Sequence, residues 1–512
     1  MTATENVPRD CENITTFAVA DFGAAGDGVT NDYAAIHAAL EAARACPGKT
    51  VVQFAPNAVY RLCAPEGVRT GIELFHFTDL TLLGDNTTLV FERLFTYIDI
   101  QYSRRIRIQG LNLKLWRPPY TVAEFLEADY AARTALIRTR DPLGITGHWR
   151  SPTDANFGLP MIDEARLHMF FRDIDVVDAE KHLYRLHFTA GGDMIDDRLH
   201  MVMERGCGFL TPMPEVGQRN VNAFLTTHTE DLTLWDVNLW SASYFNFHMR
   251  YNTGEFLLHH VCLTPEPGQP GEMVAWRDGF HIKDNRAHFT WEDCVIEKIF
   301  DDAFNLSCSL MRVNKVYSPY EFNLWCVDLN GHYPPALLPG DELLLTNERT
   351  GALLGRIPIA EVLRQDGEGT RVRVDVPLPL DMENDVYAAC TTLAQPGATI
   401  RRCRVDGSFR FRGCVRIYDS DFTVTHAWLE NEPIFEGPVP KDQLYRNCTF
   451  RGAKPGMKFF SFGAVSLSGV KPELKCENVV FQDCDVRPED FFIRPGNELK
   501  LVRDGQVYFE TK

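Results

Sequence analysis

The stretch EDLTLWDVNL at residues 230–239 has a pattern that recurs as GEFLLHHVCL at 254–263 and AHFTWEDCVI at 287–296. Each run alternates apolar and polar residues, with Asn, Asp or Gly in its turns. In the uninterrupted parts of the chain, similar runs recur every 20 to 35 residues or so, at 79–84, 104–113, 398–405, 443–450 and 478–486. A repeat of this length, built from strands, is typical of a parallel β-helix. The sequence therefore predicts an all-β protein with a right-handed parallel β-helix.

Residues 20–62 are expected to cover the open apolar end at which the solenoid begins. Thr30 is a good N-cap, a helical face follows over 31–45, and a Pro-Gly pair ends the helix before a strand at 50–54. The segment resembles the N-terminal cap of the pectate-lyase-like superfamily, because D-F-G-A-x-G-D-G-x-T-x-D is matched at 21–32. This resemblance implies the fold and leaves the chemistry open, since hydrolases, lyases, epimerases and phage tailspikes share that cap.

Two stretches interrupt the coil period, and both contain short alternating strands between Gly and Asp turns. They predict two inserted β-barrel or sandwich domains beside a groove, with irregular extra coils as the alternative. The expected order is a cap and first coils at 1–141, an inserted β-rich domain at 142–212, central coils with the active site at 213–334, an inserted small β-barrel at 335–397, and C-terminal coils at 398–512.

The charge of the chain limits its partners. The 512 residues have a formal net charge of -18 and a sequence pI near 5.3, and they contain no basic run. Phosphate or uronate polymers need clustered Lys and Arg, so a neutral glycan is favoured over nucleic acid, a membrane surface or polygalacturonate. Residues 1–17 have neither the basic nor the apolar region of a signal peptide, so a soluble, cytoplasmic protein is expected.

Fourteen cysteines are dispersed along the chain without a C-x-x-C pair. Cys262, Cys294, Cys403, Cys448 and Cys484 occupy matching places in the repeats. We expect mostly free thiols buried in the coils as small apolar side chains. A disulfide framework is the alternative, and it requires an oxidising compartment.

The stretch WRDGFHIKDNRAHFTWEDCVIEKIFDDAFNLS at 276–307 places Asp278, Asp301 and Asp302 on consecutive turns of the repeat. Neighbouring strands lie about 4.8 Å apart, so carboxylate separations of about 5 to 9.5 Å are expected, which include retaining and inverting glycosidases. Repulsion between the like charges raises at least one carboxyl pKa, so that a proton is retained at neutral pH. We predict that the three aspartates are catalytic, with Asp301 as the acid and the other two holding the water.

Sugar-binding side chains are expected on the same coils and on the preceding ones. Aromatic rings stack on the C–H faces of sugars, and His and Arg donate directed hydrogen bonds. The candidates are His281, Lys283, Asn285, Asn305, Tyr244, Phe245, His248 and Arg250, with core packing as the alternative role of each aromatic ring. Neither a metal nor a nucleotide cofactor is expected, because spaced metal ligands and a Gly-rich phosphate loop are absent from the sequence.

The aspartate motifs resemble glycoside hydrolase family 110, the inverting exo-α-galactosidases that act on terminal α-1,3-linked galactose. That family shows D-G-[FI]-H, Asn-Arg, D-D-[AS]-[FI]-N, a Pro-Gly-Asp barrel opening and a W-[YF]-E-x-G-P-V loop, matched here at 278–281, 285–286, 301–305, 339–341 and 435–439. Trp428 is displaced upstream of the last motif. The resemblance implies the three catalytic aspartates and a glycan substrate with terminal α-linked galactose. It also adds Trp428 and Glu436 to the candidate sugar-binding residues, and Glu436 is a further candidate for the acid.

A pectin hydrolase, a polysaccharide lyase and a non-catalytic β-helix are the alternatives to this function. In the polygalacturonase family the same aspartates precede Gly-His-Gly and Arg-x-Lys, and neither motif follows here, which argues against a pectin hydrolase. A polysaccharide lyase would need Ca²⁺-binding carboxylates and a base such as Lys283. A carbohydrate-binding or tailspike-like β-helix would leave the glycan intact, and such proteins usually form homo-oligomers.

Overall fold

The protein is nearly all β. The structure, a computed structural model, describes residues 14–511 except 93–95, 118–119, 151–155, 161–168, 189–207, 213–221, 243, 270, 272, 327–334, 395, 432–435, 454–455 and 467–468. Its helices are α1 (Tyr33–Ala45) and the 3₁₀ helices η1 (Val19–Phe22), η2 (Thr391–Leu393) and η3 (Pro488–Asp490). With its 13 residues, α1 falls short of a membrane-spanning length, and the described part of the chain holds no other candidate span.

Most strands pair in parallel with strands one coil away, and the pairs form three ladders. The first ladder consists of β5 (Thr70–Phe75), β7 (Thr96–Gln101), β16 (Phe224–Thr227), β18 (Phe247–Arg250), β20 (Phe280–Lys283), β23 (Asp302–Ser318), β30 (Arg404–Phe411), β32 (Asp421–Leu429), β36 (Phe460–Phe462) and β38 (Phe491–Ile493). Residues 280–281 and 302–305 of the predicted motifs lie on this ladder, and Asp278 and Asp301 lie in the turns just before β20 and β23.

The second ladder consists of β1 (Ile14–Ala18), β3 (Lys49–Gln53), β6 (Leu80–Phe91), β8 (Arg104–Leu115), β17 (Glu230–Leu239), β19 (Thr253–Leu263), β21 (His288–Glu292), β29 (Pro396–Arg401), β31 (Cys414–Tyr418), β34 (Lys441–Arg446), β37 (Glu477–Gln482) and β39 (Leu499–Arg503). A last strand, β40 (Gln506–Glu510), pairs antiparallel to β39.

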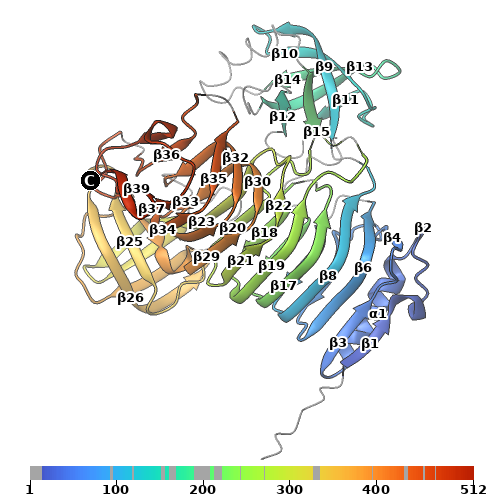
Figure 1. The fold of residues 1–512 in the computed structure, drawn as a ribbon, viewed down its shortest axis with the longest axis horizontal. Helices are drawn as coiled ribbons and strands as arrows, with labels where there is room; N and C mark the ends of the chain where they lie inside the picture. Colours follow the sequence, from blue (N-terminus) through green and yellow to red (C-terminus); the bar gives the residue numbers. More distant parts are fainter. Residues whose placement is uncertain are drawn as a thin grey trace, which may run out of the picture.

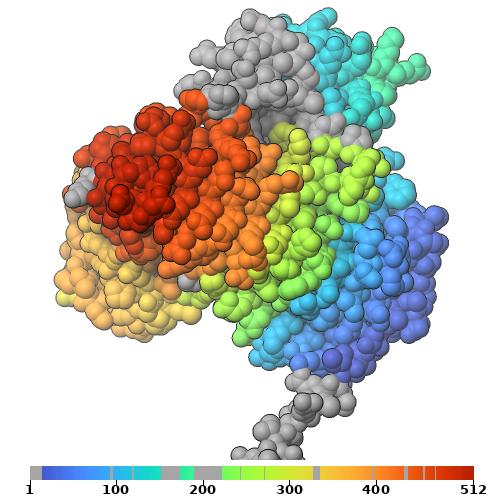
Figure 2. All heavy atoms as spheres, viewed as in Figure 1, coloured from blue at the N-terminus to red at the C-terminus, as the bar shows by residue number. Residues whose placement is uncertain are grey.

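The third ladder consists of β2 (Asp27–Asn31), β4 (Val59–Leu62), β22 (Val295–Ile296), β35 (Thr449–Gly452) and the adjoining parts of β6, β8, β17, β19, β30 and β32. The coils follow one another along the body in chain order (Figures 1 and 2). Three parallel ladders stacked in this way form a β-helix, as the repeat predicts.

Stacked side chains fill the inside of the coils. Alternation along the strands sends every second side chain inward, and register places like residues above one another. Phe247 and Phe280 stack with centroids 4.7 Å apart, and Phe280 and Phe304 follow at 5.1 Å. All three rings have no exposed surface. This column fixes the strands that carry the aspartate motifs.

Helix α1 packs against η1, β1 and β3 at the N-terminal end of the coils. Its buried residues are Ile36, Ala39, Leu40 and Ala43. The predicted N-cap Thr30 belongs instead to strand β2, and the residue before α1 is Asp32. The Asp32 carboxylate accepts hydrogen bonds from the amides of residues 25 and 26, so a loop contact replaces the expected helix cap.

A first inserted sheet contains β9 (Tyr120–Asp129), β10 (Thr134–Thr139), β11 (His148–Arg150), β12 (Asn156–Pro160), β13 (Met169–Asp178), β14 (Leu183–Phe188) and β15 (Gly208–Pro212). The antiparallel pairs β9–β10, β10–β14, β14–β13, β13–β12, β12–β15 and β15–β9 close a circuit, as in a barrel. This sheet stands to one side of the coils (Figure 1). It begins at Tyr120, before the predicted boundary at 142, and much of 142–212 lies outside the described residues.

A second circuit joins β24 (Glu321–Cys326), β25 (Glu342–Asn347), β26 (Leu353–Asp366), β27 (Gly369–Val374) and β28 (Val386–Cys390) to the second half of β23. It therefore begins before the predicted boundary at 335. The sequence hid this start because one continuous strand, β23, runs from the coil into the inserted sheet.

The twelve cysteines of the described residues are all free, in agreement with the prediction. Eight of them are buried. Cys294 and Cys403 lie next to each other on neighbouring coils, as do Cys448 and Cys484.

Candidate active site

Two neighbouring turns, 275–280 and 299–304, place the aspartates. The turns pair at both ends with the same offset, through a bridge between residues 275 and 299 and a strand pair between 280 and 304. Asp278 therefore lies opposite Asp302 on the next coil. One carboxylate oxygen from each of Asp278, Asp301 and Asp302 lies within 4.8 Å of the others. The structure thus brings the three predicted catalytic residues together.

Two arginines contact this cluster. Arg277 lies opposite Asp301, and its Nη1 donates to Oδ2 of Asp301 at 2.6 Å. Arg410 donates from Nε to Oδ2 of Asp302 at 2.5 Å. The guanidinium of Arg277 also lies 5.7 Å from the ring centroid of the buried Tyr244. Tyr244 therefore contacts the site through Arg277.

Burial sets the protonation of the cluster. It raises the pKa of Asp302 to about 7; Arg410 opposes this shift, and the charges of Asp301 and Asp278 add to it. Oδ1 of Asp302 is buried and has no hydrogen-bond partner among the described residues. Burial, with the charge of Asp301, also raises the pKa of Asp278. Asp302 therefore keeps its proton up to about pH 7, mainly because it is buried, and the like-charge crowding expected from the sequence adds to the shift.

His281 holds the third aspartate. Its Nδ1 lies 2.7 Å from Oδ2 of Asp278, and its ring stacks on Phe245 at 4.6 Å. His248, on the preceding coil, meets His281 edge-on at 5.3 Å. His281 is buried, and this contact orients Asp278.

Glu436 belongs to a buried ionic network. Arg412 donates to one of its oxygens, Asn305 donates from Nδ2 at 3.2 Å, and the Lys283 ammonium lies 3.7 Å away. Burial alone would raise the pKa of Glu436, but Arg412 and Lys283 more than offset this and hold it well below its usual range. A carboxylate held in its charged form is a poor proton donor, which argues against Glu436 as the acid. The preceding motif residue, 435, lies outside the described residues.

The side chain of Asn285 is held inside the coils. It is fully buried, and its Nδ2 donates to the carbonyls of Met249 and Lys283 at 2.8 and 3.0 Å. Its Oδ1 accepts from the backbone amide and the side chain of Asn252. With both ends of the amide bonded inside the coils, this placement argues against the predicted role of Asn285 in sugar binding.

The guanidinium of Arg250 is also bonded to partners inside the protein. Its Nη2 donates to Oδ2 of Asp284 at 2.8 Å and to the Ser309 hydroxyl at 3.0 Å. Asp284 has no exposed surface and Arg250 is 5% exposed. The predicted sugar contact of Arg250 is therefore replaced by a buried ion pair.

Trp428 extends the site toward the C-terminal coils. It pairs in register with Arg410, whose guanidinium lies 4.4 Å from the Trp428 ring centroid. One register row of the first ladder contains His248, His281, Asn305, Arg410, Trp428 and Ser461. Sequence reasoning missed Arg277, Arg410 and Arg412. The motif R-F-R at 410–412 can be read in the sequence. The second inserted sheet separates it along the chain from the aspartate motifs, so only the structure shows that its coil is the neighbour of theirs.

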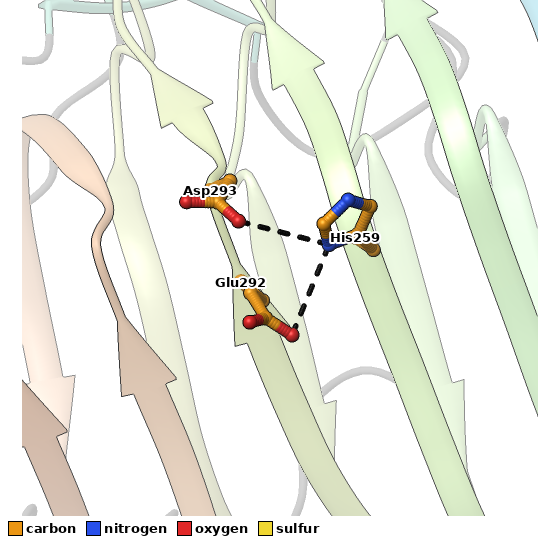
Figure 3. A group of neighbouring side chains, drawn as sticks. All are labelled: His259, Glu292 and Asp293. Atoms are coloured by element: carbon orange, nitrogen blue, oxygen red, sulfur yellow. Dashed lines mark ion pairs between the residues drawn. The ribbon is translucent and has the colours of Figure 1, made fainter.

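A second group of possible metal ligands lies on the second ladder (Figure 3). Nδ1 of His259 lies 3.8 Å from oxygens of Glu292 and Asp293. Arg401 pairs with Glu292 at 2.8 Å, and Arg402 pairs with both carboxylates. The two arginines neutralise the acids, so this group is better described as a surface ion-pair network than as a metal centre.

No protein-family model and no curated protein matches this chain. Among solved structures, an exopolygalacturonase from Thermotoga maritima is 11% identical, with a TM-score of 0.38 over 98% of this chain and 96% of that chain. A family 28 exopolygalacturonase from Yersinia enterocolitica is 10% identical, with a TM-score of 0.40 over 98% and 80%. The A-module of a mannuronan C-5 epimerase from Azotobacter vinelandii is 11% identical, with a TM-score of 0.35 over 95% and 98%. Likeness at this level identifies neither an activity nor a substrate.

Proposed function

We propose that the protein is a glycoside hydrolase that works by acid–base catalysis at Asp278, Asp301 and Asp302. The observation that carries this proposal is the pairing of a proton-retaining Asp302, whose pKa is about 7, with the arginine-held Asp301 inside 4.8 Å. Glycosidases need one carboxylic acid and one carboxylate in this relation. Both carboxyl groups contact an arginine, but the Asp302 side chain is 2% exposed and that of Asp301 is 17% exposed, and this difference in burial divides the roles.

Asp302 is the proposed acid, which differs from the sequence-based choice of Asp301. Its Oδ1, which has no hydrogen-bond partner among the described residues, would give its proton to the glycosidic oxygen as the bond from that oxygen to the anomeric carbon breaks. Asp301, whose charge Arg277 stabilises, would take a proton from water while the water oxygen bonds to the anomeric carbon. Asp278, oriented by His281, would hold that water.

An uncharged sugar suits the charges of the site. Arg277, Arg410, Arg412, Lys283 and Arg250 each pair with a carboxylate of the protein. A uronate would have to compete with these pairs for its own carboxylate partner. We propose a terminal α-linked galactose, which the motif resemblance implies, with His281 and Trp428 near the sugar. Asn305 is left out because both ends of its amide are bonded to Glu436 and Arg412.

Inversion is the proposed stereochemistry, and it rests on the resemblance. The distance between nearest oxygens is a lower limit on the separation of the carboxyl groups. Oxygen atoms within 4.8 Å of one another are compatible with a retaining pair, whose carboxyl groups lie about 5 to 5.5 Å apart. They are also compatible with the short end of the inverting range, which is about 6.5 to 9.5 Å. The anomer released first therefore distinguishes the two mechanisms.

The test is a screen of α- and β-linked nitrophenyl glycosides with the wild-type protein. On the best substrate, Asp301→Asn and Asp302→Asn should each lower turnover by about 10² to 10⁴. Asp421→Asn is the matched control, because Asp421 is exposed and lies on the third ladder. Full activity in both site variants would place the chemistry elsewhere, and no hydrolysis of any glycoside or glycan would favour a carbohydrate-binding β-helix.

A Ca²⁺-dependent lyase is the second candidate, because three carboxylate oxygens within 4.8 Å could hold a cation. Two features weigh against it. Arg277 and Arg410 already neutralise two of the carboxylates, and Lys283, the candidate base, is 2% exposed and close to Glu436. Absorbance near 235 nm on a uronate polymer, lost on chelation of Ca²⁺, would establish the lyase instead.

A further inference from the structure

A small apolar cluster joins the first inserted sheet to the two aspartate turns. Its buried members are Tyr120, Met273 and Trp276, which are 5%, 2% and 4% exposed. Val122 and Phe300 pack against them. Tyr120 and Val122 belong to β9, whereas the other three belong to the coils. The cluster is therefore an interface between the inserted sheet and the β-helix.

The coil side of this interface is directly connected to the catalytic residues. Trp276 precedes Arg277 and Asp278, and Phe300 precedes Asp301. The rings of Trp276 and Phe300 lie 6.1 Å apart, so the cluster spans both turns. A shift of either ring would move the next residues of the turn along with it.

The inserted sheet has its own core, which does not include these residues. Ile137, Ile174, Tyr184 and Leu186 are among the buried members of that core. A substitution in the interface therefore perturbs the packing of the sheet against the coils, whereas a substitution in the sheet's own core perturbs its folding. This separation supplies a control that weakens the sheet without touching the turns.

We propose that the cluster of Tyr120, Met273 and Trp276 positions the catalytic aspartates. The packing of β9 against the coils would then set the separation of the three carboxylates and exclude water from them. This inference rests on the proposed function for its kinetic consequences, but the geometry of the turns can be measured without it. Tyr120, Met273 and Trp276 act through the turns as positioning residues. Displacements of about 1 Å at catalytic groups lower rates by about 10²-fold.

The test compares Tyr120→Ala with Ile174→Ala, which removes a buried apolar side chain from the core of the same sheet. Tyr120→Ala should lower kcat about 10-fold to 10²-fold with KM within about twofold, because the chemical step depends on carboxylate geometry. Ile174→Ala should leave kcat within about twofold. Met273→Ala, which perturbs the interface from the coil side, should repeat the effect if Tyr120→Ala does not fold.

A second readout is independent of turnover. Water entering the loosened turns would return the pKa of Asp302 toward its ordinary value. In the pH profile of kcat/KM, the alkaline limb would then move to lower pH. The urea concentration at the midpoint of unfolding would also decline less steeply between pH 5 and 8. Both changes should appear in Tyr120→Ala and be absent from Ile174→Ala.

The two proposals fail in different ways. If Tyr120→Ala and Met273→Ala match Ile174→Ala in kcat, alkaline limb and pH dependence of the unfolding midpoint, the positioning role is wrong. If the wild-type protein hydrolyses no glycoside but the midpoint becomes less pH-dependent in Tyr120→Ala and not in Ile174→Ala, the positioning role stands and the proposed function fails.

Discussion

Replacing Asp302 by Asn should change how the stability of the protein depends on pH. Burial raises the pKa of this carboxyl from 3.8 to about 7 in the folded protein. Between these values the folded state keeps a proton that the unfolded state has lost. Unfolding then releases a proton, so the free energy of unfolding falls as pH rises through this window.

The size of the effect follows from the shift. Each pKa unit corresponds to about 1.4 kcal/mol, so a shift from 3.8 to about 7 corresponds to about 4 kcal/mol at most. Asn cannot ionise, so this contribution to the pH dependence is absent from Asp302→Asn. The attraction of Arg410 for the ionised carboxylate is already included in the value of about 7 and needs no separate correction.

The assay is urea unfolding of reduced protein followed by tryptophan fluorescence at several pH values from 4 to 8. The wild-type midpoint should decline with rising pH, and the Asp302→Asn midpoint should decline less. Asp421→Asn, at an exposed position, should follow the wild type. Identical pH dependence of wild type and Asp302→Asn would refute a buried, proton-retaining Asp302.

Three further outcomes are expected. Because Asp302 must be protonated to act as an acid, kcat/KM should fall as pH rises through about 7, and a profile that stays flat to pH 9 would contradict the assignment. With an α-galactoside as substrate, NMR should show the β-anomer first, whereas an early α-anomer would indicate a covalent intermediate and retention. Thiol titration of the denatured, unreduced protein should approach the 14 cysteines of the chain, and a value near zero would indicate disulfides.

The register of the two aspartate turns shows how far the sequence could locate the site. Coil length placed Asp278 and the Asp301-Asp302 pair on neighbouring turns, and the structure brings their carboxylates within 4.8 Å. The offset between the turns then makes Asp302 the direct neighbour of Asp278, and Arg277 that of Asp301. An offset longer by one residue would place Arg277 opposite Asp302 instead of Asp301, and the coil length was not known to that accuracy.

Several candidate residues on the right coils proved to have other partners. Asn285 and Arg250 lie on the predicted strands and turns, but their side chains bond within the protein. Residue type and alternation indicate which strand a residue belongs to, whereas its partner depends on the neighbouring coil and the packing there. The inserted sheets were missed at their starts for the same reason, because a strand has the same alternation whether its partner is parallel or antiparallel.

The sequence by itself determined the β-helix and the turns that carry the acids, because stacked coils require an apolar side chain at every second position and turn residues at a fixed period. Only the tertiary structure decided the electrostatics of those acids. Arg410 reaches Asp302 across 108 residues of sequence, since an inserted sheet separates two coils that are neighbours in space. Burial at that contact raises the pKa of Asp302, and burial is a property of the assembled coils rather than of any local stretch of chain.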